Sequence, residues 1–352
     1  MRIKLEKRTV VPKWMVVVVS ILSVLLSLPV IAVIFKLKGV DPILAYKKIF
    51  TGAFGSTYGL SETVVKAIPL ILCGVGLAIP FRALIWNIGA EGQLLIGAIV
   101  STGIALKFPD WPAYILLPTM FIVGFIGGAV WGMIPGFLRA KLRANEVITT
   151  LMLNYIAYKL LEYLVYGPWK GKEEWGFPYT SKFSPSAQLP RLFNTRIHYP
   201  TLILGLVLAI LTYILIYRTK WGYEIRVVGE NPEAANYAGI SHLKVILLVM
   251  ALSGGFAGLA GVGEVAGIQH RLRLGISPGY GYTAIIVAWL GRLHPLAIVL
   301  TSLLFGGLLV GGDMIQVALG LPFAAIDIFN GVILFFVLAG DFIMKYKIRI
   351  LR

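Results

Sequence analysis

Two stretches of the sequence place glycine and polar side chains inside otherwise apolar sequence. The first, WNIGAEGQ over residues 86–93, carries Asn87, Glu91 and Gln93, and the second, over residues 275–282, reads GISPGYGY. Irregular backbone at membrane depth persists only where it is buried in protein or faces a water-filled cavity. A helix that begins at such a break offers free N–H groups and a positive dipole end to a polar guest. The two breaks therefore indicate a transport site, as paired interruptions of this kind do in membrane transporters.

Two carboxylates, Glu91 and Glu264, fall within apolar stretches. A charge at membrane depth costs about 2.5–3.5 kcal/mol, so such a residue is usually functional or paired. For Glu91 the alternative to contact with a transported molecule is capping, because a carboxylate is favoured at a helix start.

Three amides, Asn87, Gln93 and Asn154, lie within or beside the apolar segments. They suit a neutral polar solute such as a sugar or nucleoside better than an ion, although hydrogen bonding between helices explains them equally well. The candidate solute pathway therefore comprises Asn87, Glu91, Gln93, Asn154 and Glu264.

The sequence offers no set of residues for chemical catalysis. Its single cysteine, Cys73, excludes an internal disulfide and a CxxC metal site, and its four histidines are scattered with no HExxH. No G-x-x-x-x-G-K-[ST] is present to hold nucleotide phosphates. We therefore predict no enzyme activity, no catalytic residue, no bound metal and no cofactor. Energy for transport must come from another chain or from an ion gradient.

The elements that position these residues follow from composition. Of the 352 residues 58% are hydrophobic and 14% charged, against about 45–50% and about 25% in soluble domains. This predicts an all-α polytopic membrane protein in one integral-membrane domain, 1–352. About ten segments are long or apolar enough to lie in the bilayer. They lie near 14–35, 64–80, 92–106, 113–135, 147–166, 200–217, 244–263, 281–290, 295–312 and 326–343.

The two breaks occupy similar places in the two halves of the chain. Each opens a short apolar segment, so broken half-helices are expected at both. A glycine-containing apolar run precedes each break and another follows the short segment, which predicts an internal repeat. Two further glycine runs read as close helix-packing faces; they comprise Gly124, Gly127, Gly128, Gly132, Gly254, Gly255, Gly258 and Gly261.

The excess of basic residues indicates membrane topology rather than binding of nucleic acid. The net charge is +16, and Lys and Arg in short loops orient membrane helices and face lipid headgroups. Alternating the segments puts more Lys and Arg inside when both termini are cytoplasmic. This predicts a cytoplasmic N-terminal tail, 1–13, an extracytoplasmic loop, 167–199, and a cytoplasmic loop, 218–243, in a multi-pass protein of the plasma or inner membrane.

Within that cytoplasmic loop the sequence predicts a short helix over 231–240. Asn231 is a good N-cap, Pro232 suits the first helical position, Glu233 favours the positive end and Gly239 stops the helix. The helix is either an ordered connector or a coupling helix that docks into a soluble motor subunit.

The sequence of this predicted helix resembles a motif of a known protein family. Glu233-Ala234-Ala235 followed by Gly239 resembles the EAA…G motif of ABC importer permeases, although its I-x-L-P ending does not follow Gly239. GENPEAANYAGI resembles the permease family for ribose, other simple sugars, nucleosides and branched-chain amino acids. NIGAEGQLLIGA, NEVITTLMLNYIA and GYGYTAIIVAWLGRLHPLAI are most similar to its nucleoside and simple-sugar branch.

The resemblance covers about Asp41 to Gly340. It implies a permease that moves a nucleoside or simple sugar and pairs with a second permease as a homodimer or heterodimer. A cytoplasmic ATP-binding cassette ATPase would drive it, and an extracytoplasmic solute-binding protein would supply it. The residues implied in ATPase coupling are Gly229, Asn231, Pro232, Glu233, Ala234, Ala235 and Gly239.

Two other classes compete with this interpretation. A secondary transporter driven by Na⁺ or H⁺ would need membrane carboxylates, and only Glu91 and Glu264 could serve. An integral-membrane enzyme would need a catalytic set at helical spacing, which the sequence does not show.

Overall fold

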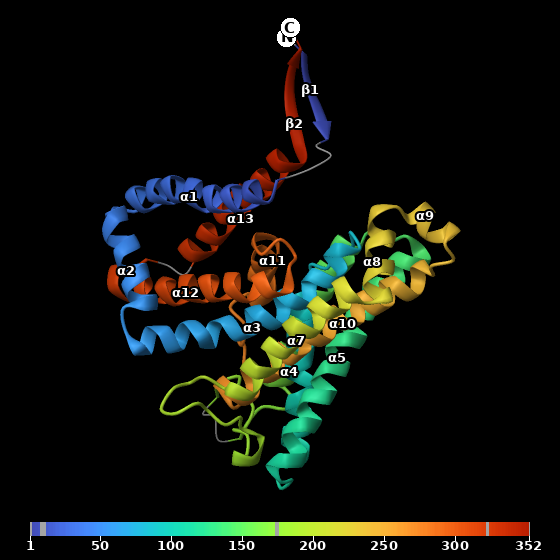
Figure 1. The fold of residues 1–352 in the computed structure, drawn as a ribbon. Helices are drawn as coiled ribbons and strands as arrows, with labels where there is room; N and C mark the ends of the chain where they lie inside the picture. The colour runs from blue at the N-terminus through green and yellow to red at the C-terminus, as the bar shows by residue number, and fades with distance from the viewer. Residues whose placement is uncertain (1, 8–11, 173–175, 322–323, 352) are drawn as a thin grey trace. The chain divides into compact units, whose positions relative to one another are not determined.

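The computed structural model describes residues 2–7, 12–172, 176–321 and 324–351. Over these residues the protein is almost entirely helical, which confirms the predicted all-α class. Contacts divide the chain into two compact units (Figure 1). The central unit is Leu60–Gly306, and the terminal unit is Met1–Gly59 with Gly307–Arg352.

The central unit holds the predicted breaks and most of the helices. In chain order its elements are α3 (Thr57–Arg82), α4 (Ala90–Lys107), α5 (Ala113–Leu142), α6 (Glu146–Tyr166), the 3-10 turn η1 (Pro185–Ala187), α7 (Tyr199–Arg218), α8 (Lys220–Glu230), α9 (Pro232–Tyr237), α10 (His242–Gly263), the π-helical turn η2 (Glu264–Gln269), α11 (Tyr280–Leu290) and α12 (Pro295–Leu319), which continues into the terminal unit.

The terminal unit is built from α1 (Lys13–Leu37), α2 (Pro42–Phe54), the end of α12, α13 (Ala324–Lys345) and two short strands. Asp41 starts α2 by accepting a hydrogen bond from the N–H of Ile43 at 2.9 Å. This helix lies outside the ten expected segments, because two adjacent lysines, Lys47 and Lys48, interrupt its apolar sequence. Of the predicted tail 1–13, residues 1 and 8–11 lie outside the described residues. Strand β1 (Arg2–Lys7) pairs antiparallel with β2 (Tyr346–Leu351).

Each of the ten expected segments coincides with a helix, but fewer pass as complete spans. Five described helices are long and apolar enough to cross a membrane, or six if the bent pair α1–α2 counts as one span. Helix α4 has 18 residues, so it reaches about 27 Å. Helix α11 has 11 residues and reaches about 16 Å, well short of a bilayer core. The half-helix expected at the second break is therefore present, while α4 after the first break is longer but is not among the five complete spans.

The order of elements around the two breaks is the same. A long helix, a break, a shorter helix and a long helix follow one another in α3–α4–α5 and again in α10–α11–α12. This order supports the predicted internal repeat, which remains a prediction about sequence ancestry.

The core of the central unit is a contact of helix backbones. Helices α4, α5 and α10 lie side by side (Figure 1). A Cβ atom added at Gly254 or Gly258 of α10 would overlap the carbonyl oxygens of Gly128 and Gly124 on α5, and one added at Gly261 would overlap that of Leu94 on α4. The predicted glycine faces therefore do bring helices into backbone contact.

The loop between α6 and α7, which the sequence predicted to lie outside the cytoplasm, is held to the chain that follows η2. The N–H of Phe183 donates to the carbonyl of His270 at 2.8 Å, and the N–H of Thr180 donates to that of Leu272 at 3.0 Å. At its end, Arg196 forms an ion pair with Glu62 of α3 at 3.1 Å. These bonds fix the described part of the loop, 167–172 and 176–199.

The connection between α7 and α10 contains two helices where the sequence predicted one. Thr219 starts α8 by accepting from the N–H of Gly222 at 3.2 Å. Asn231 then starts α9 as expected, with its side chain accepting from the N–H of Ala234 at 3.0 Å, and Gly239 follows with φ of +72°.

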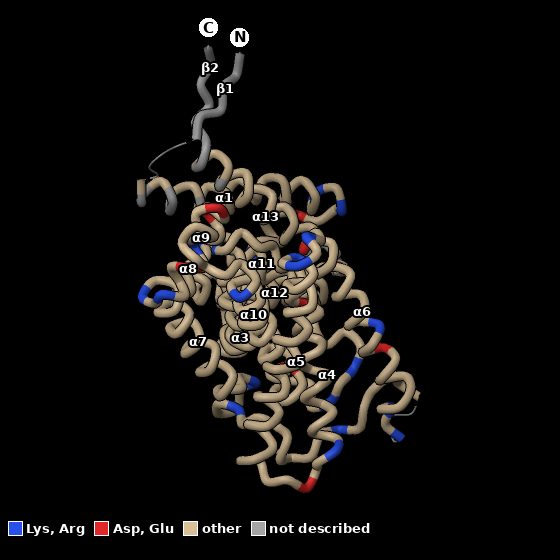
Figure 2. The backbone as a smooth tube through the Cα atoms, turned by 90° about the vertical axis from the view of Figure 1, so that its right-hand side faces the viewer, with Lys and Arg blue, Asp and Glu red and all other residues tan. Residues whose placement is uncertain are grey.

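Charged residues lie mainly toward the helix ends and connections of the central unit, as Figure 2 shows in blue and red. The middle portions of its helices are mostly uncharged. This distribution matches helices that traverse a bilayer, because lipid is a poor solvent for charge.

Candidate functional site

The first break, residues 83–89, closes on itself through an amide pair. Asn87 accepts from the N–H of Gly89 at 2.9 Å, and its amide exchanges two hydrogen bonds of 3.1 Å with Gln93. Asn87 also donates to Ser253 of α10 at 2.9 Å. Both amides are buried. Asn87 and Gln93 therefore stabilise the break and do not line the pocket described below.

A polar stripe on α6 supplies hydrogen-bond partners to the backbone of this break. Glu146, Thr150 and Asn154 are spaced four residues apart, so they share one face of the helix, and all three are buried. Thr150 accepts from the N–H of Ile88 at 3.3 Å. Asn154 accepts from the N–H of Gly92 at 2.8 Å and donates to the carbonyl of Ile88 at 2.9 Å. The stripe thus satisfies irregular backbone that lipid could not.

The second break, residues 270–279, leads into α11 through a serine cap. Ser277 accepts from the N–H groups of Gly279 at 3.2 Å and Tyr280 at 3.0 Å. Gly279 adopts φ of +89°, a conformation that favours glycine. The turn places the first turn of α11 beside the start of α4.

Glu91 joins the two helix starts. Its carboxylate accepts from the N–H of Gly281 at 2.8 Å, and Gly281 is so close to α4 that a Cβ there would overlap the backbone nitrogen of Glu91. The expected capping role is therefore present, but the helix whose first turn it satisfies is α11 rather than its own. A carboxylate is favoured there by the positive end of the helix dipole.

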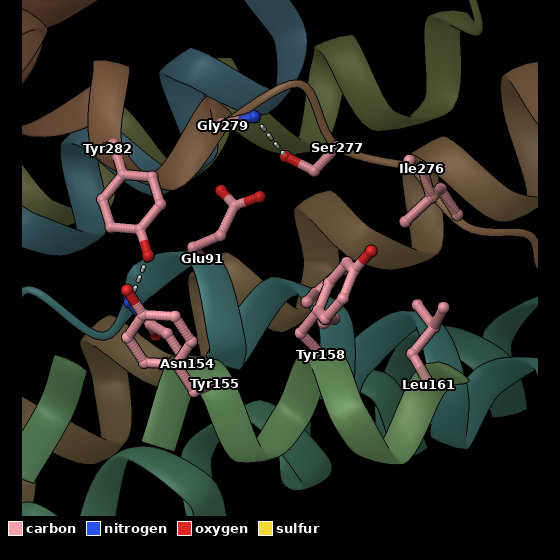
Figure 3. Close-up of a pocket in the computed structure, with 11 residues that line it drawn as sticks. Glu91, Asn154, Tyr155, Tyr158, Leu161, Ile276, Ser277, Gly279 and Tyr282 are labelled. Carbon is pink, nitrogen blue, oxygen red and sulfur yellow. Dashed lines mark hydrogen bonds between the residues drawn. The ribbon is translucent and has the colours of Figure 1, made fainter. Parts of the chain in front are cut away.

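A pocket of about 340 Å³ lies beside this junction (Figure 3). In the figure the Glu91 carboxylate points toward the turn that carries Ser277, and Tyr155, Tyr158 and Leu161 rise from α6. Its lining residues are Glu91, Leu95, Asn154, Tyr155, Tyr158, Leu161, Gly275, Ile276, Ser277, Gly279 and Tyr282. A carboxylate, hydroxyl groups and aromatic rings therefore converge on one cavity.

Of the five residues predicted for the solute pathway, Glu91 and Asn154 line this pocket. The Asn154 side chain bonds other residues of the protein: besides its bonds to Gly92 and Ile88, it donates to the Tyr282 hydroxyl at 3.1 Å. Glu264 is buried at the start of η2 and is absent from the pocket lining.

The tyrosines and Ser277 were missed as site residues by the sequence analysis. Tyr282 and Ser277 belong to the second break itself, so their position in GISPGYGY was an available signal. Tyr155 follows Asn154 directly, and helical spacing from Asn154 could have placed Tyr158 and Leu161 on the same face of α6 as the polar stripe.

The predicted coupling residues lie on α8, on α9 and in the turn after it. Gly229 packs against the end of α3: a Cβ added there would lie 2.5 Å from the carbonyl oxygen of Arg82 and 2.9 Å from the carbonyl carbon of Ala83. Glu233 is in the first turn of α9 and is exposed. The α8–α9 segment therefore contacts the chain where the first break begins.

Two histidines of the loop region have lowered pKa values. His198, completely buried before α7, has its pKa lowered to about 4, first by desolvation and then by nearby positive groups including Arg191 and Arg196. Burial and the Arg191 guanidinium lower the pKa of His270. Its Nε2 lies 2.6 Å from Arg191 Nη2, so the close contact requires a neutral ring. Among the described residues no cluster of His, Cys, Asp or Glu could hold a metal ion.

Comparison with known proteins agrees with this architecture. A family model for the permease component of the branched-chain amino acid transport system matches residues 59–338. The glucose ABC transporter permease protein TsgB13 of Haloferax volcanii is 39% identical over 99% of this chain and 94% of its own length.

Two bacterial relatives match at similar coverage. The guanosine ABC transporter permease protein NupP of Bacillus subtilis is 35% identical over 93% of this chain and 94% of its own. The nucleoside ABC transporter permease protein NupB of Lactococcus lactis is 33% identical over 94% and 92%. A multi-pass helical chain with these similarities is an ABC transporter permease subunit, and it belongs to the family of branched-chain amino acid transport system permease components.

Proposed function

We propose that this permease imports a nucleoside or a simple sugar through the pocket beside Glu91. The observation that most supports this proposal is the composition of the pocket lining. Tyr155, Tyr158 and Tyr282 supply rings and hydroxyls, and none of the lining residues is Lys or Arg. Aromatic faces stack on bases and on the apolar faces of sugars, while hydroxyls and Glu91 can bond solute hydroxyls. The names of the relatives, for glucose, guanosine and nucleosides, support the same two classes.

We further propose that transport is driven by a cytoplasmic ATP-binding cassette ATPase that docks on α8 and α9. The exposed α9 and the packing of Gly229 against Arg82 and Ala83 support this assignment, since they connect a surface helix to the first break. The coupling residues would be Gly229, Asn231, Pro232, Glu233, Ala234, Ala235 and Gly239. Pairing of β1 with β2 supports the placement of both termini on one side, which we assign to the cytoplasm.

The remaining partners are an extracytoplasmic solute-binding protein and a second permease subunit. The ordered loop between α6 and α7, predicted to face outward, is the surface we assign to the binding protein. Exposed apolar side chains on α6, including Ile148, Met152 and Ile156, are available to lipid or to the second permease.

Uptake by the assembled transporter tests the proposal. The permease is reconstituted with its ATPase, its binding protein and its partner permease, and uptake of labelled guanosine and glucose is measured. We expect uptake of one of them to require ATP and to persist when Na⁺ and H⁺ gradients are collapsed. Uptake that persists without ATP and stops when a gradient is collapsed would instead establish the secondary transporter.

A further inference from the structure

Glu146 occupies a position that the solute pocket and the coupling helices do not explain. It begins α6, and its side chain is only 9% exposed. One carboxylate oxygen lies 3.3 Å from Nε of Arg139, in the last turn of α5. The other accepts from the backbone N–H of Trp86, in the first break, at 3.5 Å. One buried carboxylate therefore contacts both the α5–α6 connection and the first break.

A simple helix cap does not account for this arrangement. Asn145 is the N-cap of α6 and already accepts from the N–H of Val147 at 3.0 Å. The start of α6 is thus satisfied locally without the Glu146 side chain. Both oxygens of that carboxylate are directed to residues on other segments, so its contribution is to relative position.

The segment that contains Trp86 and Glu91 contacts both ends of α11. The Trp86 indole stacks on Trp289, near the end of α11, with ring centroids 5.5 Å apart and planes 19° apart. Five residues after Trp86, Glu91 binds Gly281 at the start of the same helix. A displacement of Trp86 would therefore reach the turn that lines the pocket.

We propose that Glu146 is a positioning residue for transport, fixing Trp86 relative to the α5–α6 connection so that the Glu91 end of the pocket moves with that connection. The inference rests on the proposed function and identifies a structural contact through which the site can be regulated. Arg139 is 44% exposed on its side chain, so this end of the contact remains open to a partner while the Glu146 end is buried.

The first test measures solute moved per ATP hydrolysed by the reconstituted transporter. We expect Glu146→Ala to lower this ratio about tenfold, which is about 1.4 kcal/mol of coupling, with the amount of protein in the membrane unchanged. Glu146→Gln keeps an acceptor for the Trp86 N–H and should retain most of the ratio. The matched control is Glu162→Gln, which removes an exposed ion pair with Lys159 on the same helix.

The second test needs no transport partner, so it separates failure of this inference from failure of the proposed function. The only cysteine, Cys73, is buried, so Leu95→Cys adds a single reporter at a pocket-lining position that is 5% exposed. We expect Glu146→Ala to raise the maleimide labelling rate of this reporter about tenfold, and Glu162→Gln to leave it unchanged.

Each result decides the inference. A faster labelling rate with a lowered transport ratio in Glu146→Ala, and near-normal values in Glu146→Gln, supports it. A labelling rate in Glu146→Ala equal to that of Glu162→Gln overturns it, whether or not the wild-type complex transports nucleoside or sugar. Equal loss of the ratio in the Ala and Gln variants also overturns it, because the Trp86 contact would then contribute nothing.

Discussion

The carboxylate of Glu91, in the first turn of α4, accepts a hydrogen bond of 2.8 Å from the backbone N–H of Gly281, in the first turn of α11. The two breaks of the chain are therefore joined directly, at the edge of the pocket. Leaving such a buried N–H group without an acceptor costs about 1–3 kcal/mol. Two helix starts that lie 190 residues apart in sequence thus behave as one structural feature.

Glu91→Ala should separate the two helix starts and abolish most uptake, because it removes the acceptor of the Gly281 N–H. Glu91→Gln retains a neutral acceptor and should keep intermediate activity. Uptake and membrane abundance of both variants are measured together. Wild-type uptake by Glu91→Ala would contradict the assigned role.

Gly281→Ala should destabilise the protein, because its Cβ would overlap the backbone nitrogen of Glu91. Overpacking of this kind typically costs about 1–3 kcal/mol. The measurement is the unfolding temperature in detergent. Gly331→Ala on α13 is the control, since no atom lies within 4 Å of the added Cβ. Equal unfolding temperatures in the two variants would show that the close approach is absent.

Tyr158→Ala should raise the KM for the transported solute severalfold, because the ring that lines the pocket is lost while the helix remains. Tyr163→Ala removes an exposed ring from the same helix outside the pocket and should leave KM unchanged. Transport kinetics with the reconstituted complex distinguish them. Equal KM values would place the solute elsewhere.

Gly239 tests the coupling helix through its conformation. Its φ is +72°, and no atom lies within 4 Å of an added Cβ, so backbone strain alone decides which residues are tolerated. Asn adopts this conformation more readily than Val, so Gly239→Asn should retain more ATP-driven uptake than Gly239→Val. Equal uptake by the two variants would show that the turn is unimportant.

Glu233→Gln changes only the exposed charge on α9. If α9 docks on the ATPase, this variant should lose uptake and the stimulation of ATP hydrolysis while the permease remains in the membrane. ATPase activity of the reconstituted complex is the measurement, and unchanged stimulation would argue against docking through Glu233.

Acidification should loosen the loop region through His198. Its pKa falls from 6.5 to about 4 on burial, so between these values the unfolded chain binds a proton that the folded chain does not, and stability decreases as the pH falls. The full difference is about 3 kcal/mol. The unfolding temperature should therefore drop more steeply from pH 7 to pH 4.5 in the wild type than in His198→Gln. Parallel curves would contradict this.

The sequence predicted the helical class, the places of both breaks and the start of α9, because each has a local signal in apolar length, glycine and capping residues. It could not predict that Glu91 satisfies α11 rather than α4. That partnership depends on which helix starts meet in space, and no spacing in the chain encodes the meeting. Asn87 and Gln93, assigned to the solute pathway, bond each other within the first break, and Asn87 also bonds Ser253, 166 residues away.

Helices α2 and α8 show a different limit. Both carry lysines or glutamates within short sequences of mixed polarity, so a search for long apolar segments passes over them. Their N-cap residues, Asp41 and Thr219, can be recognised in the sequence, but a search based on apolar composition does not use them. The pocket tyrosines were likewise visible, but a tyrosine in an apolar helix gives no indication of the side on which a cavity lies.

The glycine contacts among α4, α5 and α10 limit how the molecule can change shape. Carbonyl groups of one helix already touch the backbone of the next, and a close-packed protein interior is hardly compressible. These three helices must therefore move as a rigid body. Any opening and closing that accompanies the passage of solute has to be carried by the segments around them, such as α6, which has exposed apolar side chains at Ile148, Met152 and Ile156.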